Sequence, residues 1–396
     1  MTIMEKMAEI AGAIDNHYLK EARLAGKRVI GYFCSYIPVE LIHAAGFVPY
    51  RMRAVGSAGT DLADAYYAPL NCSFVRHCFD RALRGDFGFL DGVVFMNGCD
   101  HTRRMYDNWR YSKTGPEFLH MFFAPHVMGG NAAGAFRESM ANLKKALEKS
   151  FGVTIADDNL RNSIRLYNRM RGLLLALDER RKMKSPPVSG SEMLGIVMAV
   201  TAVPVEDACA LLEEVIAFID GRGDSRSGDV RIIMLAGCME EADHLRLYED
   251  SGGVIVSDAF CFGTRLYGRA LDENIDPAVA LAAGYLGSEI SCPRMMDDFP
   301  RRIEWVARKA GEYSADAVVV EKLKFCDMWG WEIERLRRES KKGVIPPVLA
   351  IEREYLGGAS GQVRTRIQAF FEQIRNRQEI DDAILRSERA AYYVRK

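Results

Sequence analysis

Nine cysteines lie along the 396 residues of this chain, and their placement is the first indication of chemistry. An odd number of thiols cannot all pair as disulfides, and the chain has no Cys-x-x-Cys sequence of the kind that binds zinc or carries dithiol chemistry. Three roles remain for these thiols: packing in the core, nucleophilic attack and ligation of a soft metal. The cysteines are Cys34, Cys72, Cys78, Cys99, Cys209, Cys238, Cys261, Cys292 and Cys326.

Six of the cysteines stand at positions where a fold presents ligands. Apolar runs typical of buried strands precede four of them, and two more stand near predicted helix starts. Parallel strands meet their ligands at their carboxyl ends, and a helix N-terminus lowers a thiol pKa and favours bound anions. Thiolates that converge in a protein interior are typical ligands of iron–sulfur clusters. The strand-end cysteines are Cys34, Cys99, Cys238 and Cys326, and those at helix starts are Cys72 and Cys292.

The other three cysteines fit this pattern less well. Cys78 follows Cys72 by six residues, which places it about 240° round a helix, so the two thiols are not expected to face one site. Cys78 and Cys209 are therefore assigned to the core. Cys261 follows the predicted strand 254–258 and is expected to line the same cleft as the strand-end cysteines.

Other common catalytic signatures are missing from the sequence. The chain has no GxxxxGK[ST] phosphate loop, no GxGxxG turn after the first predicted strand, no GxSxG elbow and no HExxH pair. Ser35, Glu40 and His101 are candidates for proton transfer by position alone, because they lie near cysteines that end predicted strands.

The elements that would hold these cysteines alternate between strand and helix. Buried strands are predicted at 28–34, 92–96 and 230–238, each followed by a helical pattern, which is typical of an α/β fold with a parallel sheet. The pattern of the first part of the chain returns after residue 228, which indicates a duplicated doubly wound domain. In this duplication Cys34 corresponds to Cys238, Cys72 to Cys292 and Cys99 to Cys326.

Long helical patterns separate the two halves. Charged segments with apolar residues at i, i+3 and i+4 spacing occupy 138–149 and 159–184, and the Gly- and Ser-rich segment 221–228 is the clearest linker. These features predict a first α/β domain at 1–135, a helical connector or cap at 136–228 and a second α/β domain with C-terminal helices at 229–396.

Composition limits the classes of partner. The 53 Lys and Arg residues and the 54 Asp and Glu residues leave a formal net charge of -1, so neither a nucleic-acid partner nor an anionic membrane is expected. No apolar run reaches the ~18 residues of a membrane-spanning helix, and the first residues carry charges where a secretory signal has its apolar core. We therefore expect a cytoplasmic protein.

Several segments together resemble the 2-hydroxyacyl-CoA dehydratase family, which includes subunits of benzoyl-CoA reductase and the double-cubane cluster proteins. The resemblance spans nearly the whole chain, and its motifs are specific as a set rather than singly. They lie at 31–46 (GYFCSYIPVELIHAAG), 71–78 (NCSFVRHC), 97–100 (NGCD), 324–327 (KFCD) and 363–370 (VRTRIQAF).

The resemblance implies two flavodoxin-like domains with a [4Fe-4S] cluster between them, held by Cys72, Cys99 and Cys326. It implies anaerobic chemistry on an acyl-CoA: one electron added to the thioester expels the 2-hydroxyl group and is later returned. A benzoyl-CoA reductase would instead leave the electrons in a dearomatised ring. A separate ATP-hydrolysing iron–sulfur activator protein would deliver the low-potential electrons, in agreement with the missing phosphate loop in this chain.

The resemblance leaves three kinds of protein open. The first is a catalytic subunit of a dehydratase or acyl-CoA reductase, paired with a paralogous subunit in a heterodimer. The second is a homodimeric reductase of small molecules with a double-cubane [8Fe-9S] cluster, whose second set of ligands is Cys34, Cys238 and Cys292, with Cys261 as a substitute. The third is a subunit that only relays electrons, and the segment 327–332 (DMWGWE), which departs from the family pattern, leaves room for it.

Overall fold

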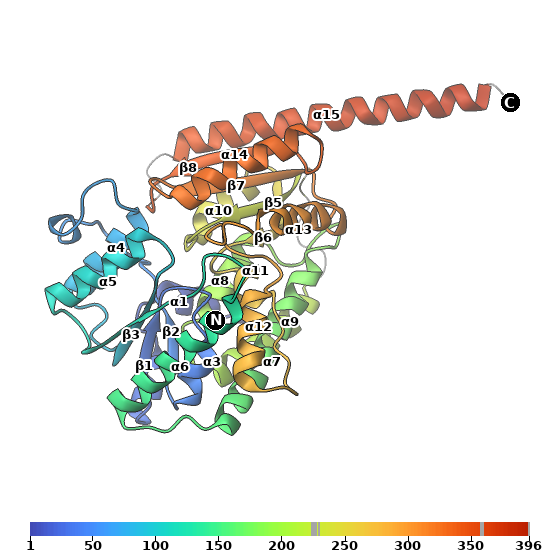
Figure 1. Ribbon diagram of the computed structural model, residues 1–396. Coiled ribbons are helices and arrows are strands. Elements are labelled where there is room, and N and C mark those ends of the chain that lie inside the picture. Colours follow the sequence, from blue (N-terminus) through green and yellow to red (C-terminus); the bar gives the residue numbers. More distant parts are fainter. Residues whose placement is uncertain (223–227, 229, 357–359, 395–396) are drawn as a thin grey trace.

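The computed structural model describes residues 1–222, 228, 230–356 and 360–394, with side chains up to residue 379. Within these residues the chain forms two four-stranded parallel sheets flanked by helices (Figure 1). Most of the linker predicted at 221–228 lies outside the described residues. No described helix is both long enough and apolar enough to cross a membrane.

The first sheet has the strand order β2-β1-β3-β4, with every neighbouring pair parallel. Its strands are β1 (Val29–Tyr32), β2 (Val48–Arg51), β3 (Gly92–Met96) and β4 (Phe118–Phe122). The first three strands are buried along their whole length, as expected for strands covered by helices on both faces. The helices of this half are α1 (Ile3–Gly12), α2 (His17–Leu24), α3 (Val39–Ala44), the 3-10 turn η1 (Ala63–Ala65), α4 (Ser73–Leu83), α5 (Asp100–Ser112) and α6 (Ala132–Phe151).

The second sheet repeats the order of the first as β6-β5-β7-β8, again all parallel. Its strands are β5 (Val230–Ala236), β6 (Gly253–Ala259), β7 (Ala317–Leu323) and β8 (Val348–Arg353). Its helices are α10 (Ala242–Glu249), α11 (Thr264–Tyr267), α12 (Pro277–Leu286), α13 (Phe299–Glu312), α14 (Asp327–Lys341) and α15 (Ser360–Val394). In each sheet the second strand of the chain lies on one side of the first strand, and the third and fourth strands follow on its other side. This order is the flavodoxin-like arrangement, and it is what a duplication predicts.

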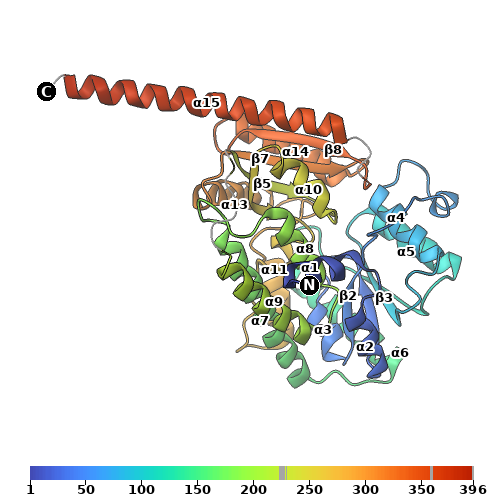
Figure 2. The ribbon, with the colours of Figure 1, turned by 180° about the vertical axis from the view of Figure 1, so that it is seen from behind.

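Three helices lie between the two sheets in the sequence. The first two contact both halves in space, and the third packs on these two and on α1 (Figures 1 and 2). They are α7 (Asp157–Arg180), α8 (Gly190–Val200) and α9 (Val205–Asp220). Helix α8 begins with a capping box between Ser189 and Glu192, and it packs on α1, α10 and β6. Helix α6 runs across residue 135, and the division at 135 and 228 stays a prediction.

The sequence predicted a helix start at Cys292, and this prediction is wrong. Cys292 lies in a segment of turns, and α13 begins only at Phe299. Pro300 at the start of α13 fixes where the helix begins, because proline lacks the N–H that a position further inside a helix donates. The Arg302 guanidinium reaches back from α13 to the carbonyls of Cys292 and Met295 and holds the turns in place.

Helix α15 is 35 residues long, which is about 52 Å at 1.5 Å per residue. Its first half lies along the second sheet, where four side chains are buried, and its second half extends past the body of the molecule (Figures 1 and 2). The four buried side chains are Val363, Ile367, Phe371 and Ile374.

Candidate functional site

Three of the predicted ligands stand at the N-terminus of a helix. Cys72 is the N-cap of α4, Cys99 of α5 and Cys326 of α14, and none of these helices has a side-chain cap. The N–H groups at these helix starts therefore face the cysteines, and those of Val75 and Trp329 donate to the thiols of Cys72 and Cys326. Such N–H groups stabilise negative charge on sulfur.

The same three cysteines come from both halves of the fold and lie within electrostatic reach of one another. Burial, with a smaller effect of Cys99, raises the pKa of Cys72 to about 12. Burial also raises the pKa of Cys326, with additional effects from Cys72 and Cys99. A bound metal would shift these thiols to thiolates, because metal ligation requires the deprotonated form. We call Cys72, Cys99 and Cys326 the three-cysteine group.

His101 ties the three segments of this group together. It lies in the first turn of α5, two residues after Cys99. Its Nδ1 is 3.1 Å from Oδ1 of Asn71, the residue before Cys72. Its Nε2 is 2.9 Å from the carbonyl oxygen of Phe325, the residue before Cys326. The geometry gives His101 a positioning role, and its predicted role in proton transfer stays a prediction.

Phe325 holds an uncommon backbone conformation next to this contact. Its φ of 63° lies in the left-handed region, which a residue with a bulky side chain rarely adopts. The conformation turns the chain between β7 and α14 so that the Phe325 carbonyl reaches His101 while Cys326 caps the helix. Local strain of this kind is held by surrounding structure and is common at functional sites.

Four further cysteines form a second group, which we call the four-cysteine group: Cys34, Cys238, Cys261 and Cys292. Cys34 and Cys238 follow the equivalent strands β1 and β5, and Cys261 follows β6. A hydrogen bond from Cys238 lowers the pKa of Cys261 despite its burial, and Arg265 lowers it further. Burial raises the pKa of Cys34 and of Cys292, and Cys261 adds to both shifts.

The two groups adjoin. Cys292 is among the residues that raise the pKa of Cys326, so the second group reaches the first on that side. By contrast, Cys78 on α4 and Cys209 on α9 are buried in the hydrophobic core, as the sequence predicted.

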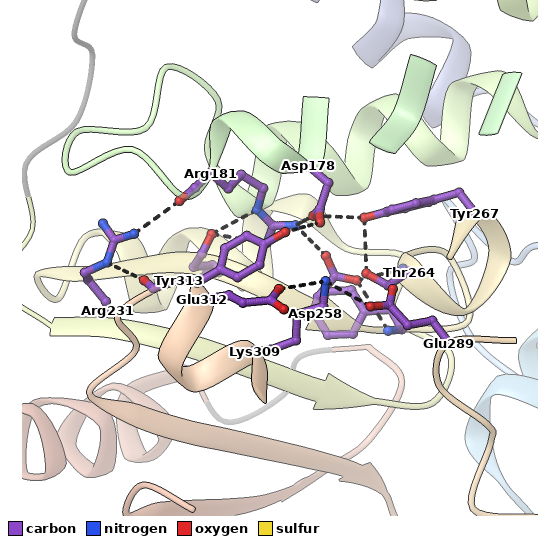
Figure 3. A network of polar contacts seen from close by, with 12 residues as sticks. Asp178, Arg181, Arg231, Asp258, Thr264, Tyr267, Glu289, Lys309, Glu312 and Tyr313 are labelled. Atoms are coloured by element: carbon purple, nitrogen blue, oxygen red, sulfur yellow. Dashed lines mark hydrogen bonds and ion pairs between the residues drawn. The ribbon is translucent and has the colours of Figure 1, made fainter. Parts of the chain in front are cut away.

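A network of buried charges positions the loop that carries Cys261 (Figure 3). Arg181, which is fully buried, donates to Asp178 at 2.9 Å and to Asp258 at 2.8 Å. Asp258 lies in β6 three residues before Cys261, and its second oxygen accepts the N–H of Thr264 at 3.2 Å. The network therefore fixes both ends of the loop between β6 and α11.

Glu40 and Ser35 have contacts of a structural kind. Glu40 is fully buried, forms an ion pair with Arg171 and accepts the hydroxyl of Tyr285 at 2.7 Å. The carbonyl of Ser35 accepts a hydrogen bond from Arg269 at 2.9 Å. Neither contact reveals a proton donor facing the cysteines, and the catalytic role of both residues stays a prediction.

A set of buried arginines near the four-cysteine group was not predicted from the sequence. Two of them, Arg51 and Arg53, stand at the carboxyl end of β2. A position at the end of a strand was the signal for four of the cysteines, and the same signal could have identified Arg51 and Arg53. The remaining members follow no pattern that the sequence displays: Arg265, Arg269 and Arg294.

The two cysteine groups do not have the geometry of a site for a single metal ion. Among the described residues, no three or more His, Cys, Asp or Glu side chains gather as the ligands of one ion would. A cubane differs because its cysteines bind separate iron atoms, so they stand farther apart than the ligands of one ion. Half-buried thiols, free helix N-termini and buried cations are the features that fit an anionic cluster.

Comparison with known proteins agrees with the motifs. The chain is 27% identical over 361 residues to the putative dehydratase subunit YjiM of Escherichia coli (strain K12), covering 88% of this chain and 92% of that protein. It is 25% identical to the (R)-phenyllactyl-CoA dehydratase beta subunit of Clostridium sporogenes, covering 90% of this chain and 94% of the relative. It is 26% identical to a benzoyl-CoA reductase subunit of Thauera aromatica, covering 76% of this chain and 79% of the relative.

All three relatives are named as subunits, two of a dehydratase and one of a reductase, so each is described as part of a larger enzyme. The family match itself covers residues 34–374, which include all seven cysteines of the two groups. The chain therefore belongs to the enzyme family described as 2-hydroxyglutaryl-CoA dehydratase, D-component.

Proposed function

We propose that this chain is the iron–sulfur subunit of a 2-hydroxyacyl-CoA dehydratase or a related acyl-CoA reductase, with a [4Fe-4S] cluster on Cys72, Cys99 and Cys326. One observation carries the proposal: three uncapped helix N-termini from both halves of the fold each present a cysteine to the others. When bound, such a cluster supplies one-electron transfer and an iron atom with an open coordination position.

The residues of the chain have distinct tasks in this proposal. The three thiolates hold the cluster, and the N–H groups of Val75 and Trp329 stabilise the charge on two of them. His101 fixes the spacing of the three segments through Asn71 and Phe325.

The substrate and the electron donor follow from the relatives. Their names specify acyl-CoA esters, so we propose an acyl-CoA thioester as the substrate of this enzyme, bound at or near the cluster. A separate ATP-hydrolysing iron–sulfur activator would supply the electrons, and a paralogous subunit would complete the enzyme. We place the reaction in the cytoplasm and expect it to require anaerobic conditions.

The direct test is an iron and acid-labile sulfide analysis of anaerobically purified protein. Cys99→Ser should remove most of the iron bound at the three-cysteine group, about four atoms per chain for one cubane. Cys209→Ser is the matched control, because this thiol is buried in the core on α9 and should leave the iron content unchanged. Equal iron content in both variants would contradict the proposal.

A second candidate function is the double-cubane reductase of small molecules, which acts as a homodimer. The observation that favours it is the four-cysteine group, whose members adjoin the three-cysteine group through Cys292. Seven thiols then surround one region, enough for an [8Fe-9S] cluster. Cys238→Ser separates the candidates: iron content stays near that of the wild type for a single cubane and falls for a double one.

A further inference from the structure

Nine arginines are buried in the described part of the chain, and they divide into two kinds. Four of them form an ion pair with a buried carboxylate, as a charge taken out of water requires. The pairs are Arg171 with Glu40, Arg181 with Asp178 and Asp258, Arg302 with Glu332, and Arg353 with Glu321.

The other five buried arginines form no ion pair with a described carboxylate, although each of these residues is no more than 8% exposed. Their guanidinium groups donate to backbone carbonyls, stack on aromatic rings or keep a nitrogen without any hydrogen bond to a described residue. Such unpaired nitrogens are Nε and Nη1 of Arg51, Nη1 of Arg53, Nε of Arg265 and Nε of Arg294. The fifth member, Arg269, donates to the carbonyls of Ser35 and Arg265.

Three of the five act directly on the four-cysteine group. Arg265 donates to the sulfur of Cys261 at 3.7 Å. The Arg51 guanidinium lies 5.0 Å from the ring centroid of Phe262, the residue after Cys261, and it lowers the pKa of Cys261. Arg294 is held by the carbonyls of Ala124 and Pro125 at 3.0 and 2.7 Å. Its guanidinium lies 5.4 Å from the ring centroid of Tyr36, whose hydroxyl accepts the N–H of Cys292 at 3.3 Å.

A protein carboxylate accounts for only a small part of this positive charge. Glu240 lies close enough to Arg51 and Arg53 to be influenced by both. One of its oxygens is already held by the Tyr355 hydroxyl and the N–H of Ala54, and it contributes a single negative charge. Cys261, whose pKa is lowered beside Arg265 and Arg51, offers a second negative charge. The remaining cations need a further anionic partner, because an uncompensated buried charge is strongly destabilising.

The three-cysteine group has a different electrostatic environment. The strongest charges acting on Cys72 are those of Cys99 and Glu354, and those acting on Cys326 come from other cysteines. Cations near an iron–sulfur cluster favour its reduced, more negative form, and anions disfavour it. The two groups would therefore hold clusters of unequal reduction potential.

We propose that Arg51, Arg265 and Arg294 raise the reduction potential of a cluster held by the four-cysteine group above that of the cluster held by the three-cysteine group. This inference rests on the double-cubane form of the proposed function. The buried arginines would make the four-cysteine group the preferred place for a single electron added to the two groups, with no bond made or broken.

The test is a redox titration of the anaerobically purified full chain, followed by electron paramagnetic resonance. The wild type should bind about eight irons and show two midpoint potentials. Arg51→Gln, Arg265→Gln and Arg294→Gln should each lower the higher midpoint by at least ~59 mV, a tenfold change for one electron, and leave the lower midpoint nearly unchanged. Arg104→Gln, an exposed arginine on α5, is the matched control and should move neither.

Arg51→Lys separates the effect of the positive charge from the effect of the side-chain shape. Because lysine retains the charge, this variant should keep the higher midpoint potential of the wild type. If the Gln variant loses four irons, recovery of iron in Arg51→Lys supports the inference and failure to recover overturns it. Unchanged midpoints in all three Gln variants overturn it as well. About four irons and one midpoint in the wild type overturn the inference but leave the single-cluster function intact, whereas absence of iron removes both.

Discussion

His101 shows how a single side chain links the parts of the candidate site. Both of its ring nitrogens contact oxygen atoms of residues that immediately precede a cysteine, one on each half of the fold. Its own helix begins at the third cysteine of the group. In the proposed enzyme, a side chain in this position would set the spacing of the three cysteines without contacting the cluster itself.

At this scale we predict that His101→Ala binds a [4Fe-4S] cluster but releases its iron faster, by several-fold, when a chelator is added. The reason is that the Asn71 and Phe325 segments lose their common partner. Iron release is followed by absorbance under anaerobic conditions. His17→Ala, an exposed histidine at the start of α2, is the control, and equal rates in the two variants would count against the positioning role.

The residues of the site were predictable only in part. A position after a predicted strand indicated five of the seven thiols, and Cys72 was correctly placed at a helix start. Cys292 was also expected at a helix start, which the structure does not have, although its thiol lies in one of the two adjoining groups. The buried arginines escaped prediction, because burial of a charged residue depends on contacts between distant segments, such as that of Arg294 with Ala124 and Pro125. The contacts of Phe325 and His101 likewise exist only once α5 and α14 are placed together.

At the scale of elements, the ion-pair network of Figure 3 connects α7 to β6 and α11. Arg181→Met should lower the free energy of unfolding by ~3–5 kcal/mol, because Asp178 and Asp258 remain buried without their cation. Chemical denaturation measures this loss. Arg180→Met removes the neighbouring, more exposed pair with Asp220 and should cost no more than ~1 kcal/mol. Similar losses in both variants would show that the network is not what holds the loop.

Glu321 in β7 connects the second sheet to α10 and β8. Burial by itself would raise the pKa of this carboxyl, but His244, Arg353 and Tyr248 outweigh burial and lower the pKa to about 2, from an ordinary 4.5. Because the pKa is lower in the folded state, the resulting stability is fully present above pH 4.5 and is lost as the pH falls toward 2.

This linkage predicts that acidification removes on the order of 3 kcal/mol of stability through Glu321 alone. The measurement is the difference in unfolding free energy between wild type and Glu321→Gln at a series of pH values, so that contributions common to both proteins cancel. The difference should shrink between pH 4.5 and 2. A difference that is constant over this interval would contradict the lowered pKa.

Elements were predicted best where they are buried on all sides. The strand 92–96 agrees with β3 to the residue, and the helical segment predicted at 159–184 covers most of α7. The edge strands β4 and β8 were not predicted. Both are partly exposed, and His120 interrupts the apolar run of β4. The helix expected at Cys292 failed because the sequence does not reveal that turns precede Pro300.

At the scale of the whole molecule, the repeated strand order explains why cysteines lie at equivalent places in the two halves. In both sheets the first and third strands lead to a cysteine. Cys99 after β3 lies close enough to Cys326 after β7 to raise its pKa. The duplication was predictable from recurring cysteines and strands, whereas the projecting end of α15 was not (Figure 2).

The relatives named as beta subunits lead to a prediction about assembly. If the chain forms a heterodimer, it should turn over an acyl-CoA only when its paralogous subunit and the activator are both present. Activity assays with each component omitted in turn measure this dependence. Turnover by this chain with the activator alone would exclude both a relay role and the need for a second subunit.

The most direct measurement is the iron and labile sulfide content of anaerobically purified protein, with electron paramagnetic resonance after reduction. The account predicts at least about four irons with matching sulfide, and a cluster signal that disappears in Cys72→Ser, Cys99→Ser and Cys326→Ser. A wild-type protein without labile sulfide, or serine variants that all keep the full signal, would contradict the claim that these three thiolates share one cluster.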